Sequence, residues 1–289
     1  MSYKVSLVGI GMAVFVRWAA AADVVYVSSF NTDTVLKFNA QNGAPLGAFV
    51  PAGSGGLDGP TGLTFGPDGN LYVSSFVLSS RVLKYDGRSG QFLGVFVSEQ
   101  SGGLKGPTDL SFGPDGNLYV ASGYGGGVFR YNGHTGAFMD RFTAQPGGAE
   151  GVRWRTGSVY VSSHMSNNVF QFNAHGGALA GPIVQGSLHW ATGFDFGPDG
   201  NLYVASFFDD SVVKFNAKTG QGMGTFANNC FGPQMIRFAP NGNLYVASYS
   251  GDSVDCFDGR TGKLMRTISG NGLSGPMGVA FRAQRLDQK

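Results

Sequence analysis

Two histidines and one glutamate are the side chains of this sequence best suited to metal or acid–base chemistry: His164, His189 and Glu150. Two imidazoles and a carboxylate can ligate a divalent metal ion, or they can serve as a base, an acid and an orienting group. We therefore predict Glu150, His164 and His189 as catalytic residues and as ligands of a divalent metal ion. No diagnostic local motif surrounds them, so a structural role stays open, in which His164 fills an aromatic position and His189 closes a loop.

Arg153, Asp195 and Arg237 form a second group, because they occupy equivalent positions in three successive stretches of the chain and alternate in charge. Alternating charges favour an ion triad in which the aspartate neutralises the two arginines. The alternative is an anion site in which one arginine holds a carboxylate, since a guanidinium matches the two oxygens of that group. We therefore also consider Arg153 and Arg237 as ligand-binding residues.

Aromatic residues recur at one further position of these stretches, at Phe30, Phe76, Phe207 and Tyr249. His164 occupies the same position in another stretch, and Trp190 directly follows His189. We predict that Phe30, Phe76, Phe207 and Tyr249 form an apolar wall for a ligand and that Trp190 is a further ligand-binding residue. Packing within the fold explains the same aromatic residues equally well.

These residues stand out because they interrupt an internal repeat. The segment Gly66-Pro-Asp-Gly-Asn-Leu-Tyr-Val73 recurs at 113–120 and 197–204, in a variant form at 239–246 and in a degenerate form at 155–161. A second motif begins at valines that are 47, 46, 41, 43 and 42 residues apart, namely Val35, Val82, Val128, Val169, Val212 and Val254. Periods of this length that are rich in strand-forming residues indicate a β-propeller.

Each period divides into four strands. In one period they are expected at Thr61–Phe65, Leu71–Ser75, Val82–Tyr85 and Phe92–Val97, joined by turns rich in glycine, proline and aspartate. Counting the third strands predicts an all-β fold, a six-bladed β-propeller of four-stranded antiparallel blades. The chain starts with a second strand at 23–29 and ends with a first strand at 277–282, so these two strands are expected to pair and close the ring.

The predicted blades place the candidate residues at one end of the central channel. In an up-and-down blade, the loop between the second and third strands lies on the same face as the loop that leads into the next blade. Aligning the repeats on the aromatic residue of each first strand puts Glu150, His164 and His189 at this channel mouth. Function in repeat folds concentrates where the repeats differ, so we expect the site there.

The composition fits this fold and excludes other classes of protein. Hydrophobic residues make up 42% of the chain and charged residues 13%, which excludes an intrinsically disordered chain. The 48 glycines follow no three-residue period, so the chain is not collagen-like. No basic run appears, so we expect no nucleic-acid partner. Cys230 and Cys256 are the only cysteines, and whether they pair stays open.

The first 22 residues have the pattern of a secretory signal peptide. Lys4 precedes the apolar run 5–16, and small residues follow at 19–22, so cleavage is expected after Ala22. The alternative is an uncleaved anchor, because Arg17 ends the apolar run. Cleavage would remove Lys4 and Arg17 and no acidic residue, which leaves 20 − 2 = 18 basic and 18 acidic side chains and a net charge of zero.

The expected organisation is therefore a signal peptide at 1–22, a propeller at 23–282 and a short C-terminal tail at 283–289. The protein is expected to be secreted or periplasmic, and no segment after the signal peptide is long and apolar enough to span a membrane.

The repeat core GPTGLTFGPDGNLYVSS at 59–75, with the VLKYD that follows at 82–86, resembles the NHL repeat family and the related repeats of streptogramin (virginiamycin B) lyases. The similarity covers 23–282. The NHL resemblance implies a propeller that binds protein, glycan or nucleic acid, and the lyase resemblance implies metal-linked residues near the central channel. Gluconolactonase-like propellers have a metal-binding glutamate early in their first inner strand, where this chain has Leu57-Asp-Gly-Pro-Thr61, which counts against a lactonase.

The sequence therefore predicts an exported, monomeric propeller that binds a small molecule, a glycan or a protein at the channel mouth. The alternative is a metal-assisted lyase, preferred over a hydrolase, that uses Glu150, His164 and His189 at the same mouth. In that alternative Arg153 or Arg237 orients an anionic group of the substrate.

Overall fold

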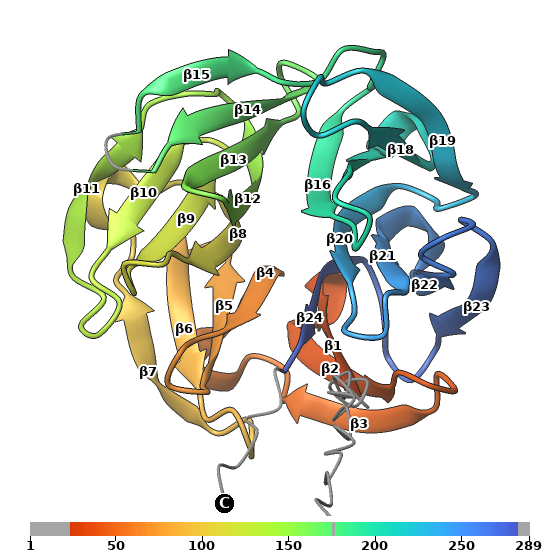
Figure 1. Ribbon diagram of the computed structural model, residues 1–289. Coiled ribbons are helices and arrows are strands. Elements are labelled where there is room, and N and C mark those ends of the chain that lie inside the picture. Colours follow the sequence, from red (N-terminus) through yellow and green to blue (C-terminus); the bar gives the residue numbers. More distant parts are fainter. Residues whose placement is uncertain (1–23, 175–176, 283–289) are drawn as a thin grey trace, which may run out of the picture.

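Six four-stranded antiparallel sheets surround a central axis in the computed structural model, which describes residues 24–174 and 177–282 (Figure 1). They are the blades of a six-bladed β-propeller, as the sequence predicts. Each blade consists of four strands that are consecutive in the chain, except blade 1, which takes its innermost strand from the C-terminal end. Within the described ranges, the helical elements are single 3-10 turns, so the fold is all-β.

Within each blade, the strands follow one another from the channel outward. They are β24 (Pro276–Phe281), β1 (Val24–Ser29), β2 (Thr34–Asn39) and β3 (Pro45–Val50) in blade 1; β4 (Pro60–Phe65), β5 (Leu71–Ser75), β6 (Arg81–Tyr85) and β7 (Phe92–Val97) in blade 2; β8 (Pro107–Phe112), β9 (Leu118–Ser122), β10 (Val128–Tyr131) and β11 (Phe138–Thr143) in blade 3; β12 (Ala149–Arg155), β13 (Ser158–Ser163), β14 (Asn168–Asn173) and β15 (Leu179–Pro182) in blade 4; β16 (Ala191–Phe196), β17 (Leu202–Ser206), β18 (Ser211–Phe215) and β19 (Gly222–Asn228) in blade 5; and β20 (Pro233–Phe238), β21 (Leu244–Ser248), β22 (Ser253–Phe257) and β23 (Leu264–Ser269) in blade 6.

The strand boundaries expected for blade 2 are close to the observed ones. Strands β5 and β7 have the predicted bounds, whereas β4 and β6 each begin one residue earlier, at Pro60 and Arg81. The 3-10 turns are η1 (Phe30–Thr32), η2 (Ser54–Gly56), η3 (Ser101–Gly103), η4 (Phe207–Asp209) and η5 (Tyr249–Gly251).

The ring is closed by the two ends of the described chain. Strand β24 pairs antiparallel with β1, so that Val25 lies opposite Phe281 and Val27 lies opposite Val279. This confirms the predicted closure. Val25, Val27 and Val279 are fully buried, so the shared blade is part of the core.

The core lies between neighbouring blades. In blade 2 the second strand buries Leu71, Tyr72 and Val73 almost completely. The tyrosine of each blade packs edge-on against the aromatic residue of the next blade's first strand, at ring-centroid distances of 4.6–5.0 Å. These pairs are Tyr26–Phe65, Tyr72–Phe112, Tyr119–Trp154, Tyr160–Phe196, Tyr203–Phe238 and Tyr245–Phe281.

The repeated turn between the first two strands is held by its aspartate. Asp68 accepts hydrogen bonds from the backbone N–H of Asn70 (3.0 Å) and from the Tyr72 hydroxyl (3.0 Å), and it pairs with Lys84 at 2.9 Å. Gly69 takes φ = +80°, which glycine adopts without strain. The polar residues of this repeated segment therefore serve to stabilise a turn.

Three further expectations concern the signal peptide, the two cysteines and membrane-spanning segments. The proposed signal peptide lies outside the described residues. Cys230, between β19 and β20, and Cys256, in β22, are both buried and unpaired. Among the described residues, the structure contains no helix with the length and apolar character that a membrane crossing requires.

Candidate functional site

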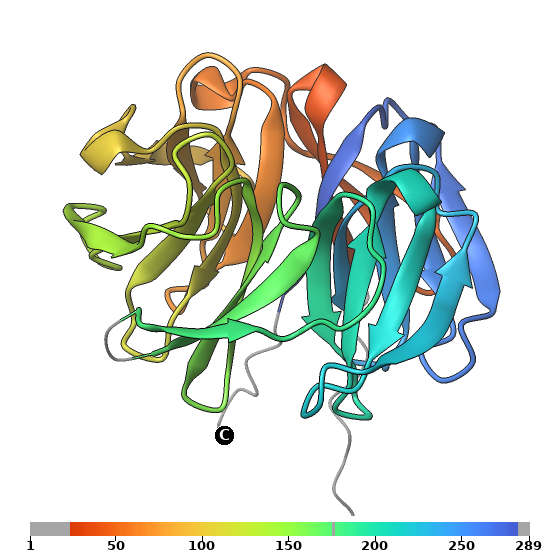
Figure 2. The ribbon, with the colours of Figure 1, turned by 90° about the horizontal axis from the view of Figure 1, so that it is seen from above.

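The two ends of the propeller differ in their loops. The five 3-10 turns of the described residues and the connections between blades lie on one face, along the upper side of Figure 2, and the hairpin turns of the repeat lie on the other. We call these the mouth face and the turn face. Glu150, His164, His189 and Trp190 belong to the mouth face, because each lies at or near the mouth-side end of a strand.

Trp190 interrupts the repeat on the mouth face. Six residues before the aromatic anchor of the first strand, the other blades have glycine, with φ between +55° and +62°: Gly59, Gly106, Gly148, Gly232 and Gly275. Trp190 occupies the same position in blade 5 with φ = +66°. A bulky side chain in this left-handed region is a conformational outlier, and it costs about 1–3 kcal/mol of backbone strain.

The backbone of Trp190 is held there by the contact that holds the glycines. Its N–H donates to Asn167 Oδ1 (2.6 Å), just as the N–H groups of Gly59 and Gly232 donate to Asp33 (2.7 Å) and Asp210 (2.8 Å). The loop therefore imposes the glycine conformation on a tryptophan.

The indole of Trp190 covers His164. The two rings are stacked, with centroids 4.3 Å apart and planes 16° apart. Nδ1 of His164 lies 2.7 Å from Oε1 of Glu150, and both side chains are about nine-tenths buried. Burial raises the pKa of Glu150, and the hydrogen bond to His164 opposes that rise. Trp190, His164 and Glu150 thus form one continuous stack from the surface into the channel.

His189 does not join this stack. Its side chain is 62% exposed, and its Nδ1 lies 2.7 Å from Oδ1 of Asp209, whose other oxygen accepts a bond from Ser206 (2.5 Å). Among the described residues, no three histidine, cysteine, aspartate or glutamate side chains gather where they could hold a metal ion. The structure therefore brings Glu150 and His164 together but directs His189 to another partner, and the donor set does not fit a metal centre.

The residues of the predicted aromatic wall lie in two separate clusters. In the first, the ring of Phe30 contacts the rings of Phe76 (6.1 Å between centroids) and Tyr249 (6.2 Å), and Phe76 contacts Tyr124 (5.4 Å). In the second, Phe208 contacts both Trp190 (5.5 Å) and Phe207 (5.2 Å). Tyr124 and Phe208 were not predicted, although Phe208 directly follows the predicted Phe207 in the sequence.

Arg153 and Arg237 meet inside the channel, but at Asp109. Nη1 of Arg153 lies 2.5 Å from one oxygen of this fully buried aspartate, and Nη2 of Arg237 lies 3.2 Å from the other. Asp195, which the alternating charges suggested as the shared partner, instead accepts backbone N–H bonds from Phe196 (2.9 Å) and Phe238 (2.8 Å). The ion triad therefore exists with a different acid, and burial raises the pKa of both aspartates against the opposing effect of Arg153.

A signal for Asp109 is present in the sequence. Three residues before the aromatic anchor, four of the six blades have glycine, at Gly62, Gly151, Gly193 and Gly278. A Cβ at Gly62 would lie 2.6 Å from the backbone of Asp109, so the inner strands approach each other there. Asp109 and Met235 replace glycine in this row, and an ionisable residue at a glycine position marks a departure from the repeat.

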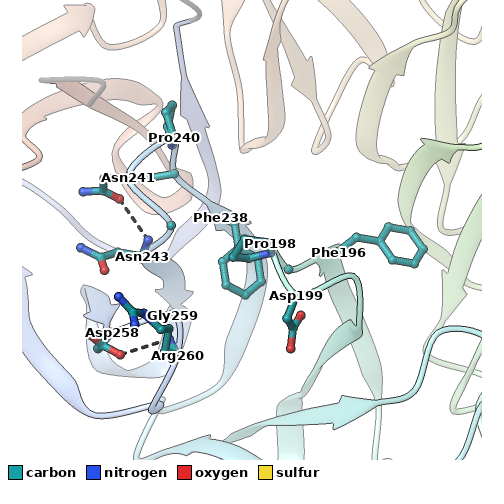
Figure 3. Close-up of a pocket in the computed structure, with 13 residues that line it drawn as sticks. Phe196, Pro198, Asp199, Phe238, Pro240, Asn241, Asn243, Asp258, Gly259 and Arg260 are labelled. Carbon is teal, nitrogen blue, oxygen red and sulfur yellow. Dashed lines mark hydrogen bonds between the residues drawn. The ribbon is translucent and has the colours of Figure 1, made fainter. Parts of the chain in front are cut away.

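A pocket of about 780 Å³ opens on the turn face, between blades 5 and 6. Figure 3 shows its lining by the hairpin turns around Pro198 and Pro240 and by Asp258 and Arg260. The backbone N–H of Arg260 donates to Asp258 (3.1 Å), and that of Asn243 donates to Asn241 (3.0 Å). The pocket lies at the opposite end of the propeller from Trp190 and His164.

No protein-family model matches the chain, and no curated protein matches it in sequence. Among solved structures, it is similar to a chain of a nidogen/laminin complex, with a TM-score of 0.75 and 12% identity, covering 90% of this chain and 98% of that one. It is also similar to a protein of unknown function from Bacteroides caccae, with a TM-score of 0.68 and 16% identity, covering 90% and 99%.

A streptogramin B lyase is a further similar structure, with a TM-score of 0.58 and 14% identity, covering 87% of this chain and 75% of the lyase. At such identities the likeness concerns the fold alone. Function has to be argued from the site, because one fold hosts many functions.

Proposed function

We propose that this protein is an exported β-propeller that binds its ligand or partner at the mouth face, around Trp190 and His164. The proposal rests on one observation: three residues that differ from the repeat contact one another in one stack. Glu150 replaces a threonine, His164 replaces an aromatic residue and Trp190 replaces a glycine, and the three side chains contact one another in sequence. Export rests on the N-terminal sequence, and the intact mass of the secreted chain tests cleavage after Ala22.

The strained conformation of Trp190 supports a functional role. Strain of this kind persists where the surrounding structure over-determines it, and such positions cluster at binding and catalytic sites. Every other blade has glycine at this position, so folding of the loop does not require tryptophan. The indole is instead placed where it is 39% exposed, on the rim of the mouth.

The Trp190→Gly variant tests this proposal. Glycine relieves about 1–2 kcal/mol of left-handed strain, and loss of the stack on His164 costs about 0.5–1.5 kcal/mol. We therefore expect the free energy of unfolding, measured in urea, to change by less than about 1 kcal/mol. In a thermal-shift screen of peptides, oligosaccharides and small metabolites, compounds that stabilise the wild type should fail to stabilise this variant.

The matched control for the conformation is Gly106→Ala. A Cβ there would lie 2.7 Å from Tyr124, at φ = +57°, so this variant should lose about 1 kcal/mol or more. The matched control for the site is Arg260→Ala on the turn face. A loss of about 3–5 kcal/mol in Trp190→Gly, typical of a buried aromatic residue, would show that the tryptophan is structural. If compounds stabilise Trp190→Gly but fail to stabilise Arg260→Ala, the binding site is the turn-face pocket.

The alternative of a metal-assisted lyase has less support, because His189 is bound to Asp209 and the three predicted ligands do not converge. We expect Zn²⁺, Mg²⁺, Mn²⁺ and Ca²⁺ to leave the melting temperature unchanged, since binding to the folded state alone would raise it. A rise with one of these ions that disappears in His164→Ala would restore the metal-dependent alternative.

A further inference from the structure

The loops of blades 4 to 6 on the mouth face expose a run of large apolar side chains. These loops are residues 164–167, 183–190, 207–210, 229–232 and 249–252, and we call them the acidic–aromatic arc. Met165 is 68% exposed, Trp190 39%, Phe208 66% and Phe231 53%. Scattered apolar residues on a surface need no explanation, but a cluster on one rim marks an interaction site.

The charge of this arc is entirely negative. Its loops contain Asp209, Asp210 and Asp252 and no lysine or arginine. The corresponding loops of blades 1 to 3, at 30–33, 51–59, 76–80, 98–106 and 123–127, also hold three carboxylates, at Asp33, Asp58 and Glu99, but they include the cation Lys105 as well. The arc therefore combines exposed aromatic faces with carboxylates, which is the combination that attracts a guanidinium or ammonium group.

The shape of the arc favours a polypeptide as the occupant. Its apolar side chains project from three blades, and the side chains that project most, Met165 and Phe208, are about two-thirds exposed. A small-molecule site is instead concave and buries most of its ligand. Projecting anchors spread over several loops fit the surface of a larger partner.

We propose that the acidic–aromatic arc docks a cationic segment of a partner polypeptide. An arginine or lysine side chain lies against the exposed part of the Trp190 indole, near the Asp209 carboxylate that pairs with the adjacent His189. Apolar residues of the same segment pack on Met165, Phe208 and Phe231. The proposal rests on the proposed function of the mouth face and names the class of partner.

Calorimetric titration with short acetylated and amidated peptides tests it. One peptide alternates arginine and leucine, a second replaces arginine by citrulline, which has the same shape without the charge, and a third replaces it by glutamate. We expect the arginine peptide to bind about tenfold more tightly than the citrulline peptide, and this preference to shrink as salt is raised. The glutamate peptide should bind most weakly.

The repeat itself supplies variants that keep the loops folded. Asn167 makes in blade 4 the backbone contact that Asp210 makes in blade 5, so Asp210→Asn removes a charge while the loop keeps its hydrogen bond. Asp252→Asn is the equivalent change next to Gly275. The double variant and Trp190→Gly should each weaken the arginine peptide about fivefold or more. Leu78→Ala, which changes an exposed apolar residue of a mouth-face loop outside the arc, is the matched control and should leave binding unchanged.

Several results would overturn the inference. Equal binding of the arginine and citrulline peptides, both dependent on Trp190, would leave the mouth as a binding site but remove the cationic partner. The same holds if none of the peptides binds while other compounds still require Trp190. Tight binding to phosphatidylcholine vesicles, or dimerisation in sedimentation, that Trp190→Gly abolishes would assign the arc to a lipid surface or to a second copy of this chain.

Discussion

Glu150 shows how one departure from the repeat replaces a hydrogen bond between two blades. At the same position Thr61, Thr108 and Thr192 donate their hydroxyls to a backbone carbonyl of the next blade, at 2.7–2.8 Å. The carboxylate of Glu150 turns instead to His164. The protein thus replaces a contact between blades by a polar pair beneath Trp190, and a buried carboxyl opposes folding when it is ionised.

The pH dependence of stability tests the state of Glu150. Burial raises its pKa in the folded protein, so its contribution to stability is present below its unfolded value, about 4.3, and is lost as pH rises through the raised pKa. Relative to the wild type, Glu150→Gln should therefore gain unfolding free energy as pH increases from about 4 to 8.

Urea unfolding at several pH values measures this difference. Glu99→Gln is the matched control, because Glu99 is the other glutamate of the chain and is exposed. A constant difference between the wild type and Glu150→Gln across this range would show that ionisation of Glu150 has no cost in the folded protein.

At the scale of elements, one carboxylate stabilises the repeated hairpin turn in blades 2, 3 and 5. Asp199 repeats the contacts of Asp68, since it accepts bonds from the Tyr203 hydroxyl (2.9 Å) and pairs with Lys214 (2.8 Å). In blade 6 asparagine occupies this position, and the hydroxyl of Tyr245 donates to the backbone of Ala40 instead (2.6 Å). The turn therefore folds with or without the charge.

Acid should weaken the turns that contain aspartate. Burial alone would raise the pKa of Asp68, but the bonds from Lys84, Asn70 and Tyr72 lower it to about 2. Its stabilisation is present above the unfolded value of about 3.9 and is lost as pH falls towards 2. Solvent screens this exposed group, so Asp68→Asn should cost less than about 1 kcal/mol at pH 7 and only a small part of that at pH 2.

Thermal unfolding at both pH values measures this effect. As a control, Asn241→Asp adds an aspartate where Cys256 stands in place of the lysine, and it should not stabilise blade 6. A stabilisation equal to that of Asp68 would show that the ion pair with lysine is unimportant.

The sequence specified the elements well, because their signals are local and repeated. Strands β5 and β7 were predicted with their bounds, since Leu-Tyr-Val alternation and glycine turns mark both ends. The side-chain directions in the site were not predictable in this way. Alignment placed His189 at the mouth but could not show that its ring binds Asp209 rather than facing Glu150. Asp109 was missed because its partners Arg153 and Arg237 belong to blades 4 and 6.

At the scale of the molecule, stability depends on the blade that both ends share. Strand β24 covers Val25 and Val27 and occupies the inner edge of β1. Without β24, the ring has an open edge and an uncovered core surface, the two features that favour aggregation.

Shortening the chain from its C-terminus tests this dependence. A chain that ends before Pro276 should lose its cooperative unfolding transition, because folded proteins are stable by only about 5–15 kcal/mol. A chain that ends after Arg282 keeps all of β24 and is expected to retain the transition of the full chain. Scanning calorimetry of both chains decides, and a cooperative transition without β24 would show that blade 1 closes in another way.

The shared blade also sets the order in which the protein is completed. Strand β1 is synthesised before any other strand of the propeller, and its partner β24 is synthesised last. At about 5–20 residues per second, translation of the chain between them takes roughly 12–50 s. During that time β1 has no inner neighbour, whereas blades 2 to 6 each acquire all four strands in turn. The ring can therefore close only after the last residue of β24 has been synthesised. A chain released before that point has an unpaired β1.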